Sequence, residues 1–124
     1  MSVSVSVTLH NGDIIGYSKL KWSDPSMGVL SGQFTPISNY ESIAYVFQFF
    51  AENPYSLLEK NDLRDVYNKM RDEMGLQLFD HKGDRITDVT AIYIDDYSRE
   101  LGADGQELVV FIRDGQYWEQ YLPR

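Results

Sequence analysis

One stretch organises this chain: Trp22-Ser-Asp-Pro-Ser-Met-Gly-Val-Leu-Ser-Gly-Gln-Phe34, then Thr-Pro-Ile-Ser38, then Asn-Tyr-Glu41-Ser-Ile-Ala-Tyr-Val-Phe-Gln-Phe-Phe50. It contains a turn, a strand and the start of the most apolar helix. Pro25 fixes φ in the turn, and Pro36 is expected to end the strand. Ser38 and Glu41 have the spacing of a capping box, so the pattern predicts a helix that begins at Ser38.

The residues before this stretch alternate between apolar and polar side chains, which predicts strands with one buried face. The first strand ends before Asn11-Gly12, the strongest short signal for a hairpin. A second strand should run over 14–22, with Gly16 at a bulge or a close backbone approach. With a third strand over 29–34, the first part of the chain is predicted to be a meander.

Two helices are predicted next. An apolar stripe of Ile43, Val46, Phe47 and Phe50, widened by Tyr40 and Ala44, belongs to the first, which should end at Asn53-Pro54. A second helix should follow a capping box or short turn at 56–59, run to Met74 and end at Gly75. Its predicted buried stripe is Leu63, Val66, Tyr67, Met70 and Met74.

The last part of the chain is predicted to return to strands over 76–79, 86–97, 108–112 and 117–122, with a loop over 98–106. The expected order is therefore βββ-αα-ββββ. This is an α+β pattern in one domain over 1–124, with a mainly antiparallel sheet and two helices packed on one face.

Composition restricts the function. The chain has 124 residues and no cysteine, so disulfides and thiol chemistry are excluded. Its net charge of -8 argues against nucleic acids and anionic membranes as partners. No basic region or apolar segment predicts a secretory signal or a membrane span, so we expect a cytoplasmic protein. A cationic partner would be attracted by the charge.

No motif of catalysis or cofactor binding is present. His10 and His81 lie in predicted turns without a second His at ligand spacing, which argues against a zinc site. The glycine-rich phosphate loops of nucleotide-binding proteins are also absent. We therefore expect no cofactor.

An acidic segment is the main candidate for function. From Asp80 to Glu107 there are eight acidic and three basic side chains, a local charge of -5. Asp95 and Asp96 end a predicted strand and should face Asp104 and Glu107 across the loop, where carboxylates could take a divalent cation or serve as paired catalytic acids. A solvated rim and a surface for a cationic protein are the other interpretations.

The predicted closing hairpin places aromatic side chains beside carboxylates. Alternation assigns Tyr117, Glu119 and Tyr121 to one face and Trp118 and Leu122 to the other. One face should pack in the core, and the tyrosine face could recognise a partner, because tyrosine is favoured in binding hot spots. The candidate partner-binding residues are Asp95, Asp96, Glu100, Asp104, Glu107, Tyr117, Glu119 and Tyr121.

The stretch 23–29, Ser-Asp-Pro-Ser-Met-Gly-Val, with Gly32, Phe34, Pro36 and Tyr40, resembles one found in small bacterial proteins without an assigned activity. This resemblance implies no functional residue. The size, acidity and α+β pattern are similar in type to bacterial immunity proteins that neutralise cationic nuclease toxins, although no motif carries that similarity.

Three hypotheses follow. The first is a non-enzymatic, acidic protein-interaction domain of the immunity or antitoxin kind that binds a basic protein. The alternative is a small ligand- or divalent-cation-binding domain, or an enzyme, that uses Asp95, Asp96, Asp104 and Glu107. The third is a homodimer paired through exposed sheet.

Overall fold

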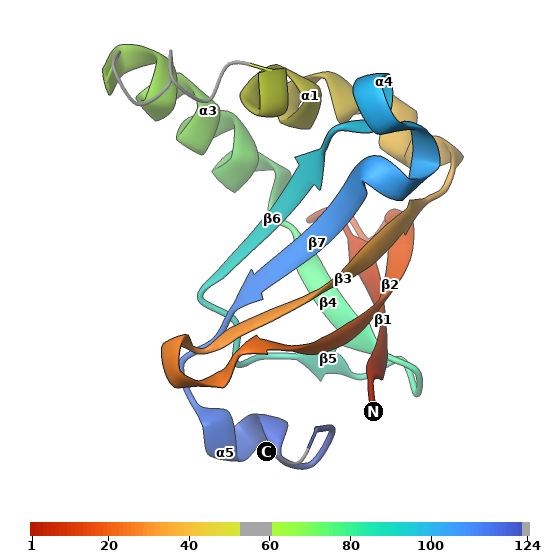
Figure 1. Cartoon of the computed structure of the whole chain (residues 1–124), viewed down its shortest axis with the longest axis vertical. Coiled ribbons are helices and arrows are strands. Elements are labelled where there is room, and N and C mark those ends of the chain that lie inside the picture. Colours follow the sequence, from red (N-terminus) through yellow and green to blue (C-terminus); the bar gives the residue numbers. More distant parts are fainter. Residues whose placement is uncertain (53–60, 123–124) are drawn as a thin grey trace.

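The protein is built on one curled, seven-stranded antiparallel sheet. The computed structural model describes residues 1–52 and 61–122, and it places the strands in the order β5-β4-β1-β2-β3-β7-β6 (Figure 1). The strands are β1 (Val3–Thr8), β2 (Ile14–Asp24), β3 (Val29–Pro36), β4 (Gln77–Asp80), β5 (Arg85–Ile86), β6 (Ala91–Asp96) and β7 (Gln106–Phe111). The mixed α and β composition and the antiparallel sheet confirm the coarse prediction.

The predicted meander forms β1, β2 and β3. The turn at Asn11-Gly12 joins the first two strands, and Leu9 N–H donates to the Asp13 carbonyl across it. The pairing shifts register between Val7 and Thr8, because β2 carries an extra residue, Ile15, at this point. The bulge therefore lies at Ile15, which is buried, one residue before Gly16, and Gly16 is the site of a close backbone approach to Thr35.

The glycines of the meander allow close approach. A Cβ on Gly16 would meet the Phe34 ring at 2.5 Å, so this glycine makes room for the aromatic side chain. A Cβ on Gly32 would lie 2.1 Å from the Lys19 carbonyl oxygen. The Ser18 hydroxyl donates to the Gln33 carbonyl oxygen at 2.8 Å, so a side chain supports this crowded part of the β2–β3 pair.

The turn at the start of the organising stretch is a short 3-10 helix, η1 (Pro25–Met27). The Asp24 carboxylate accepts hydrogen bonds from Met27 N–H at 3.2 Å and from the Ser26 hydroxyl at 2.7 Å. This is the local hydrogen bonding that an aspartate before a proline predicts.

The predicted first helix starts later than its capping box. Residues Ser38–Ser42 form a 3-10 helix, η2, without a side-chain cap, and α1 covers Ala44–Glu52. The Asn39 side chain donates to the Ile14 carbonyl oxygen at 3.0 Å and fixes this turn to β2. Tyr40 enters the core here, together with Val46 and Phe47 from α1.

The second predicted helix is α3 (Asn61–Met74), and the predicted stop at 53–54 and capping box at 56–59 lie outside the described residues. Gly75 follows with φ of +57°, as expected for a helix-ending glycine. Met74 packs on the core, but Val66 is exposed, so the predicted stripe is wrong at that position. Both α1 and α3 lie at one end of the sheet in Figure 1.

The predicted strand over 86–97 is divided. After β5 the chain crosses to β6, and Asp88 holds the crossing segment: its carboxylate accepts from Asp114 N–H at 2.8 Å and its carbonyl accepts from the Trp118 indole at 2.9 Å. The predicted loop over 98–106 contains α4 (Ser98–Leu101) and η3 (Gly102–Gly105).

The predicted closing hairpin is wrong. Residues Gly115–Trp118 form a short helix, α5, whose start is capped by the Asp114 carboxylate at 2.9 Å from Gln116 N–H. Trp118 and Leu122, four residues apart, are both buried and close the core at this end of the sheet. The Trp22 indole donates to the Leu122 carbonyl at 3.1 Å and ties the C-terminal segment to β2.

The core is the inner face of the curled sheet. It collects alternate residues of all seven strands, with the aromatic side chains of η2, α1 and α5 at its ends. Among the described residues, no helix has the length and apolar character needed to cross a bilayer.

Candidate functional site

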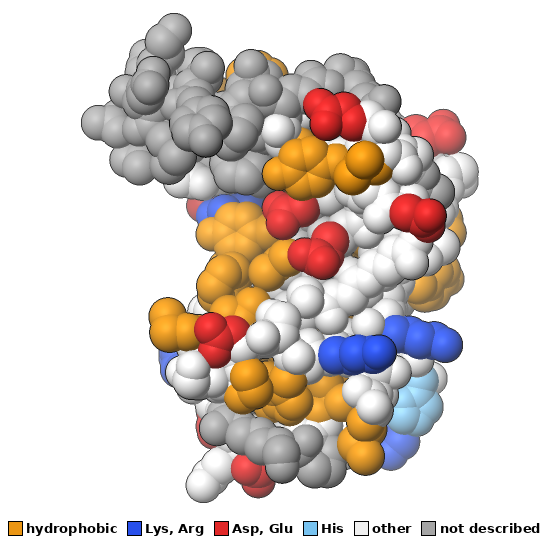
Figure 2. All heavy atoms as spheres, viewed as in Figure 1, with side chains coloured by type: hydrophobic (Ala, Val, Ile, Leu, Met, Phe, Trp, Pro, Cys, Tyr) orange, Lys and Arg blue, Asp and Glu red, His pale blue; other side chains and the backbone are white. Residues whose placement is uncertain are grey.

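The candidate site is an outer surface of the sheet on β7 and β6, beside β3. We call it the acidic–aromatic face and define it by Tyr93, Asp95, Glu107, Val109 and Phe111. The ladder sets these side chains opposite one another: Tyr93 pairs with Val109, and Asp95 pairs with Glu107. Figure 2 shows acidic and hydrophobic side chains together on this side of the molecule, over β6 and β7.

Asp95 and Glu107 are the electrostatic centre of this face. As opposed residues of an antiparallel pair, they point to the same side of the sheet. Burial raises the pKa of Asp95, and the negative charge of Glu107 raises it further. In the part of the chain that the structure describes, neither carboxylate forms an ion pair, so two like charges lie side by side.

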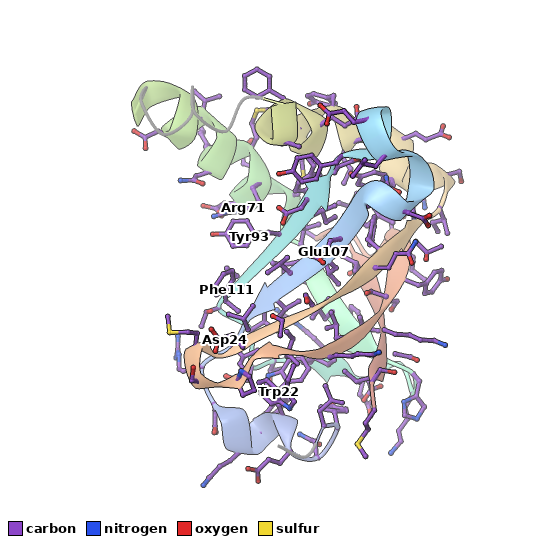
Figure 3. All side chains as sticks on the ribbon, in the orientation of Figure 1. Trp22, Asp24, Arg71, Tyr93, Glu107 and Phe111 are labelled. Atoms are coloured by element: carbon purple, nitrogen blue, oxygen red, sulfur yellow. The ribbon has the colours of Figure 1, made fainter. Side chains whose placement is uncertain are left out.

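Aromatic side chains continue the face along both strands. The Tyr93 and Phe111 rings meet edge to face, with centroids 5.5 Å apart and an interplanar angle of 81°. Phe111 remains 37% exposed. The Arg71 guanidinium from α3 lies 4.6 Å from the Tyr93 ring centroid, so this ring already holds one cation (Figure 3).

The loop after β6 adds a third carboxylate. Gln33 on β3 lies opposite Glu107 in the ladder, and its side-chain amide donates to the Asp104 carboxylate at 3.2 Å. Gln33 thereby joins the loop acid to the acidic–aromatic face. Of the expected facing of Asp95 and Asp96 with Asp104 and Glu107, the ladder contains the pair of Asp95 and Glu107, and Asp104 is joined to this face through Gln33.

Asp96 has a different environment from its neighbour. It is buried on the inner face of the sheet, where its carboxylate accepts hydrogen bonds from the Tyr40 hydroxyl at 2.6 Å and from Ser98 N–H at 2.9 Å. Burial acts to raise the pKa of Asp96, but the hydrogen bonds from Ser98, Tyr40 and Gln106 outweigh it and lower the pKa. Asp96 therefore holds η2 and α4 against the sheet and does not face a partner.

The remaining candidates lie elsewhere. Glu100 is exposed on α4, and Glu119 is exposed just after α5. Tyr117 and Tyr121 pack partly on the core: the Tyr117 hydroxyl accepts from Thr87 N–H at 3.2 Å, and the Tyr121 hydroxyl donates to the Asp80 carboxylate at 3.3 Å. Because α5 and α4 lie at opposite ends of the molecule in Figure 1, the predicted residues do not form one surface.

The carboxylates proposed for metal binding or catalysis do not converge. Asp96 faces the core, whereas Asp95 and Glu107 face outward. Within residues 1–52 and 61–122, no group of three or more His, Cys, Asp or Glu side chains is arranged to hold a metal ion.

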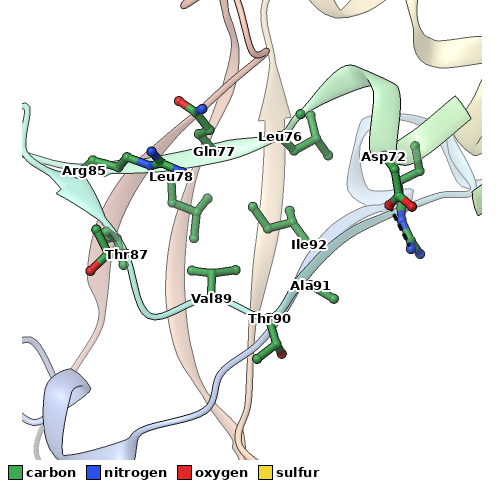
Figure 4. A pocket seen from close by; sticks show the side chains of 13 residues that line it. Asp72, Leu76, Gln77, Leu78, Arg85, Thr87, Val89, Thr90, Ala91 and Ile92 are labelled. Carbon is green, nitrogen blue, oxygen red and sulfur yellow. Dashed lines mark hydrogen bonds and ion pairs between the residues drawn. The ribbon is translucent and has the colours of Figure 1, made fainter. Parts of the chain in front are cut away.

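The sheet has an open seam between β4–β5 and β6. A cavity of about 240 Å³ occupies it, with Leu78, Val89 and Ile92 in its lining (Figure 4). Arg85 and Thr87 lie at the β5 side of the cavity. Neither this cavity nor a larger one on the outer face of β1–β2–β3 is lined by Asp95, Asp96, Asp104 or Glu107.

Comparisons with protein families, with curated proteins and with solved structures found no match to this chain. The site is therefore interpreted from its own chemistry.

Sequence reasoning missed Tyr93, Phe111 and Gln33 as members of the site. The signal for Tyr93 was present, because strand alternation places it on the same face as Asp95. The same alternation places Phe111 with Glu107 on β7, whereas Gln33 comes from β3, whose register against β7 could not be read before the sheet order was known.

Proposed function

We propose that this protein is a non-enzymatic binding domain that takes a basic protein partner on its acidic–aromatic face. The observation that carries the proposal is the pairing of Asp95 with Glu107 beside the partly exposed ring of Phe111 and the half-buried ring of Tyr93. Like charges set opposite one another destabilise a sheet, and a partner's cation between them would relieve the repulsion. Asp95 is therefore a candidate functional residue, because its pKa is raised by burial and by the charge of Glu107.

The neighbouring side chains favour an arginine or lysine of the partner. Its charged end would lie between Asp95 and Glu107, while its aliphatic part would cover Val109 or Phe111. The contact of Arg71 with Tyr93 within this chain is an example of the same chemistry. The net charge of -8 would speed the encounter with a cationic surface.

A role in neutralising a basic protein, of the immunity or antitoxin kind, is the most specific form of this proposal. This role is supported by the acidity of the chain and by the outward orientation of the acidic–aromatic face. It implies a protein that blocks its partner by binding to it. The alternative of a cation-binding or catalytic carboxylate cluster has weaker support, because its four residues are divided between two faces of the sheet.

The test is capture of partners on the immobilised protein from a lysate of the cells that produce it, at low salt and at ~0.5 M salt, where exposed charges are strongly screened. We expect a basic protein that is retained at low salt and weakened at high salt. Asp95→Asn with Glu107→Gln should abolish its retention.

A matched control has the same change in charge elsewhere. Asp84 and Glu119 are exposed in the turn after β4 and after α5, away from the acidic–aromatic face. Asp84→Asn with Glu119→Gln should keep the captured protein. Equal loss in both double variants would show that only net charge matters and would contradict the proposed site.

A further inference from the structure

A second surface of the sheet has the opposite charge. The outer face of β1–β2–β3 is hollowed into a trough of about 950 Å³, with the turn after β4 at one side. Its lining includes Ser4, Ser6, Tyr17, Lys19, Lys21 and Thr35. Figure 2 shows basic side chains on this side of the molecule, apart from the acidic ones over β6 and β7.

The register explains how the lining is composed. The lysines of β2 alternate with inward-facing residues, so Lys19 and Lys21 both point outward. Ser4 lies opposite Lys19, and Ser31 lies opposite Lys21. Each lysine therefore has a hydroxyl group on a neighbouring strand, and the Cα atoms of the two lysines are about 7 Å apart along β2.

Positive charge is not neutralised inside the trough. The one acidic residue in its described lining is Asp80, which is buried. Its carboxylate accepts hydrogen bonds from Lys82 and Asp84 N–H, both at 2.9 Å, and from the Tyr121 hydroxyl. In the described part of the chain, no ion pair involves Lys19 or Lys21. His81 adds a further nitrogen donor at the turn.

The trough also offers an aromatic surface. Tyr17 lies on β2 two residues before Lys19, between Ser6 and Thr35 of the neighbouring strands. It is 46% exposed, so its ring is available to a flat group. Two cations, several hydroxyl donors and one aromatic ring on consecutive outward positions match a ligand with a phosphate at one end and an aromatic ring at the other.

We propose that this trough binds a small phosphate ester with an aromatic ring. Lys19 and Lys21 hold the phosphate oxygens, the serine and threonine hydroxyls donate to them, and the Tyr17 ring stacks on the organic part. The volume is within the range of small-molecule sites, and none of the five residues that define the acidic–aromatic face lines the trough, although Gln33 borders both surfaces.

The test is isothermal titration of the full chain with adenosine triphosphate, inorganic triphosphate and adenosine, all at the same ionic strength. We expect saturable binding of adenosine triphosphate, weaker binding of triphosphate and the weakest binding of adenosine. Lys19→Gln with Lys21→Gln should lower the affinity for adenosine triphosphate at least tenfold. Tyr17→Ala should lower it to that of triphosphate.

The control removes the same charge from another surface. Lys69 on α3 and Arg113 after β7 are exposed and do not line the trough. Lys69→Gln with Arg113→Gln should change the affinity less than twofold, and both double variants should keep the wild-type thermal unfolding midpoint. Absence of saturable binding by both phosphate probes, or equal loss in the two double variants, would overturn the proposal. Equal affinity for triphosphate and adenosine triphosphate would overturn the role of Tyr17.

Discussion

Asp95 and Glu107 lie directly opposite one another on neighbouring antiparallel strands, and their carboxylates share one face of the sheet. This relationship places two negative charges together beside the edge-to-face pair of Tyr93 and Phe111. Such a pair costs folding free energy when the protein is alone. The proposed binding of a cationic partner would offset this cost, because its positive charge would lie between the two carboxylates.

The first prediction concerns the stability of the free protein. Because the folded-state pKa of Asp95 is raised, its penalty is absent below the unfolded pKa and fully present above the folded pKa. Asp95→Asn should therefore stabilise the protein at pH 7, by up to about 1 kcal/mol, and have no such effect at pH 3. Thermal unfolding at the two pH values measures this. A lower melting temperature at pH 7 would show that Asp95 is a structural residue.

The second prediction concerns the buried contact between Tyr40 and Asp96. Tyr40→Phe removes the hydroxyl that donates to the carboxylate at 2.6 Å and should cost about 1.5–3 kcal/mol in urea unfolding at pH 7. Because the folded-state pKa of Asp96 is lowered, its contribution is present above the unfolded pKa and lost as the pH falls through the folded pKa. The difference between the proteins should thus shrink below about pH 4. A difference that is constant with pH would indicate lost packing alone.

The third prediction tests the closing element of the core. Trp118 is fully buried, and its indole donates to the Asp88 carbonyl. Trp118→Ala should cost about 3–5 kcal/mol in chemical denaturation because it leaves a large cavity. Glu119→Ala, at the exposed neighbouring position, should stay within about 0.5 kcal/mol of wild type. Similar small effects of both changes would contradict the packing of α5 on the core.

The fourth prediction concerns the close approach of β2 and β3. Gly32→Ala would place a methyl group 2.1 Å from the Lys19 carbonyl oxygen, so the backbones must move apart, at a cost of about 1–3 kcal/mol. Ser31→Ala, one residue earlier in the same strand, adds no atom and should be nearly neutral. The free energies of unfolding of the two variants and the wild type in urea measure this difference. Equal stability of the two variants would mean that the strands are not so close.

The sequence predicted the meander of β1, β2 and β3 and the end of α3, because these signals are local. Alternation and the Asn11-Gly12 turn predicted β1 and β2, and Gly75 marked the end of α3. It failed where distant contacts decide the structure. The segment after β5 is held by Asp114 and Trp118, which lie far along the chain, and alternation alone read it as part of one strand.

The C-terminal error has a similar physical origin. Tyr117, Trp118, Tyr121 and Leu122 fit either an alternating strand or a helical turn with spacings of four. The helix is favoured because the Asp114 carboxylate caps its start and because Trp118 is buried in the core. The candidate site was predicted only in part. Asp95 and Glu107 were both candidates, but their direct pairing depends on the register of β6 against β7. The inward orientation of Asp96 follows from strand alternation.

The proposed binding of cations by the acidic–aromatic face can be followed residue by residue in solution. The amide spectrum of the 15N-labelled protein would be followed during titration with hexa-arginine at low salt. We predict shifts concentrated at Gln33, Tyr93, Asp95, Glu107 and Phe111, which disappear in the Asp95→Asn, Glu107→Gln variant and persist in the Asp84→Asn, Glu119→Gln variant. Shifts spread evenly over the exposed acids, or equal loss in both variants, would show that this face is not a specific binding site for cations.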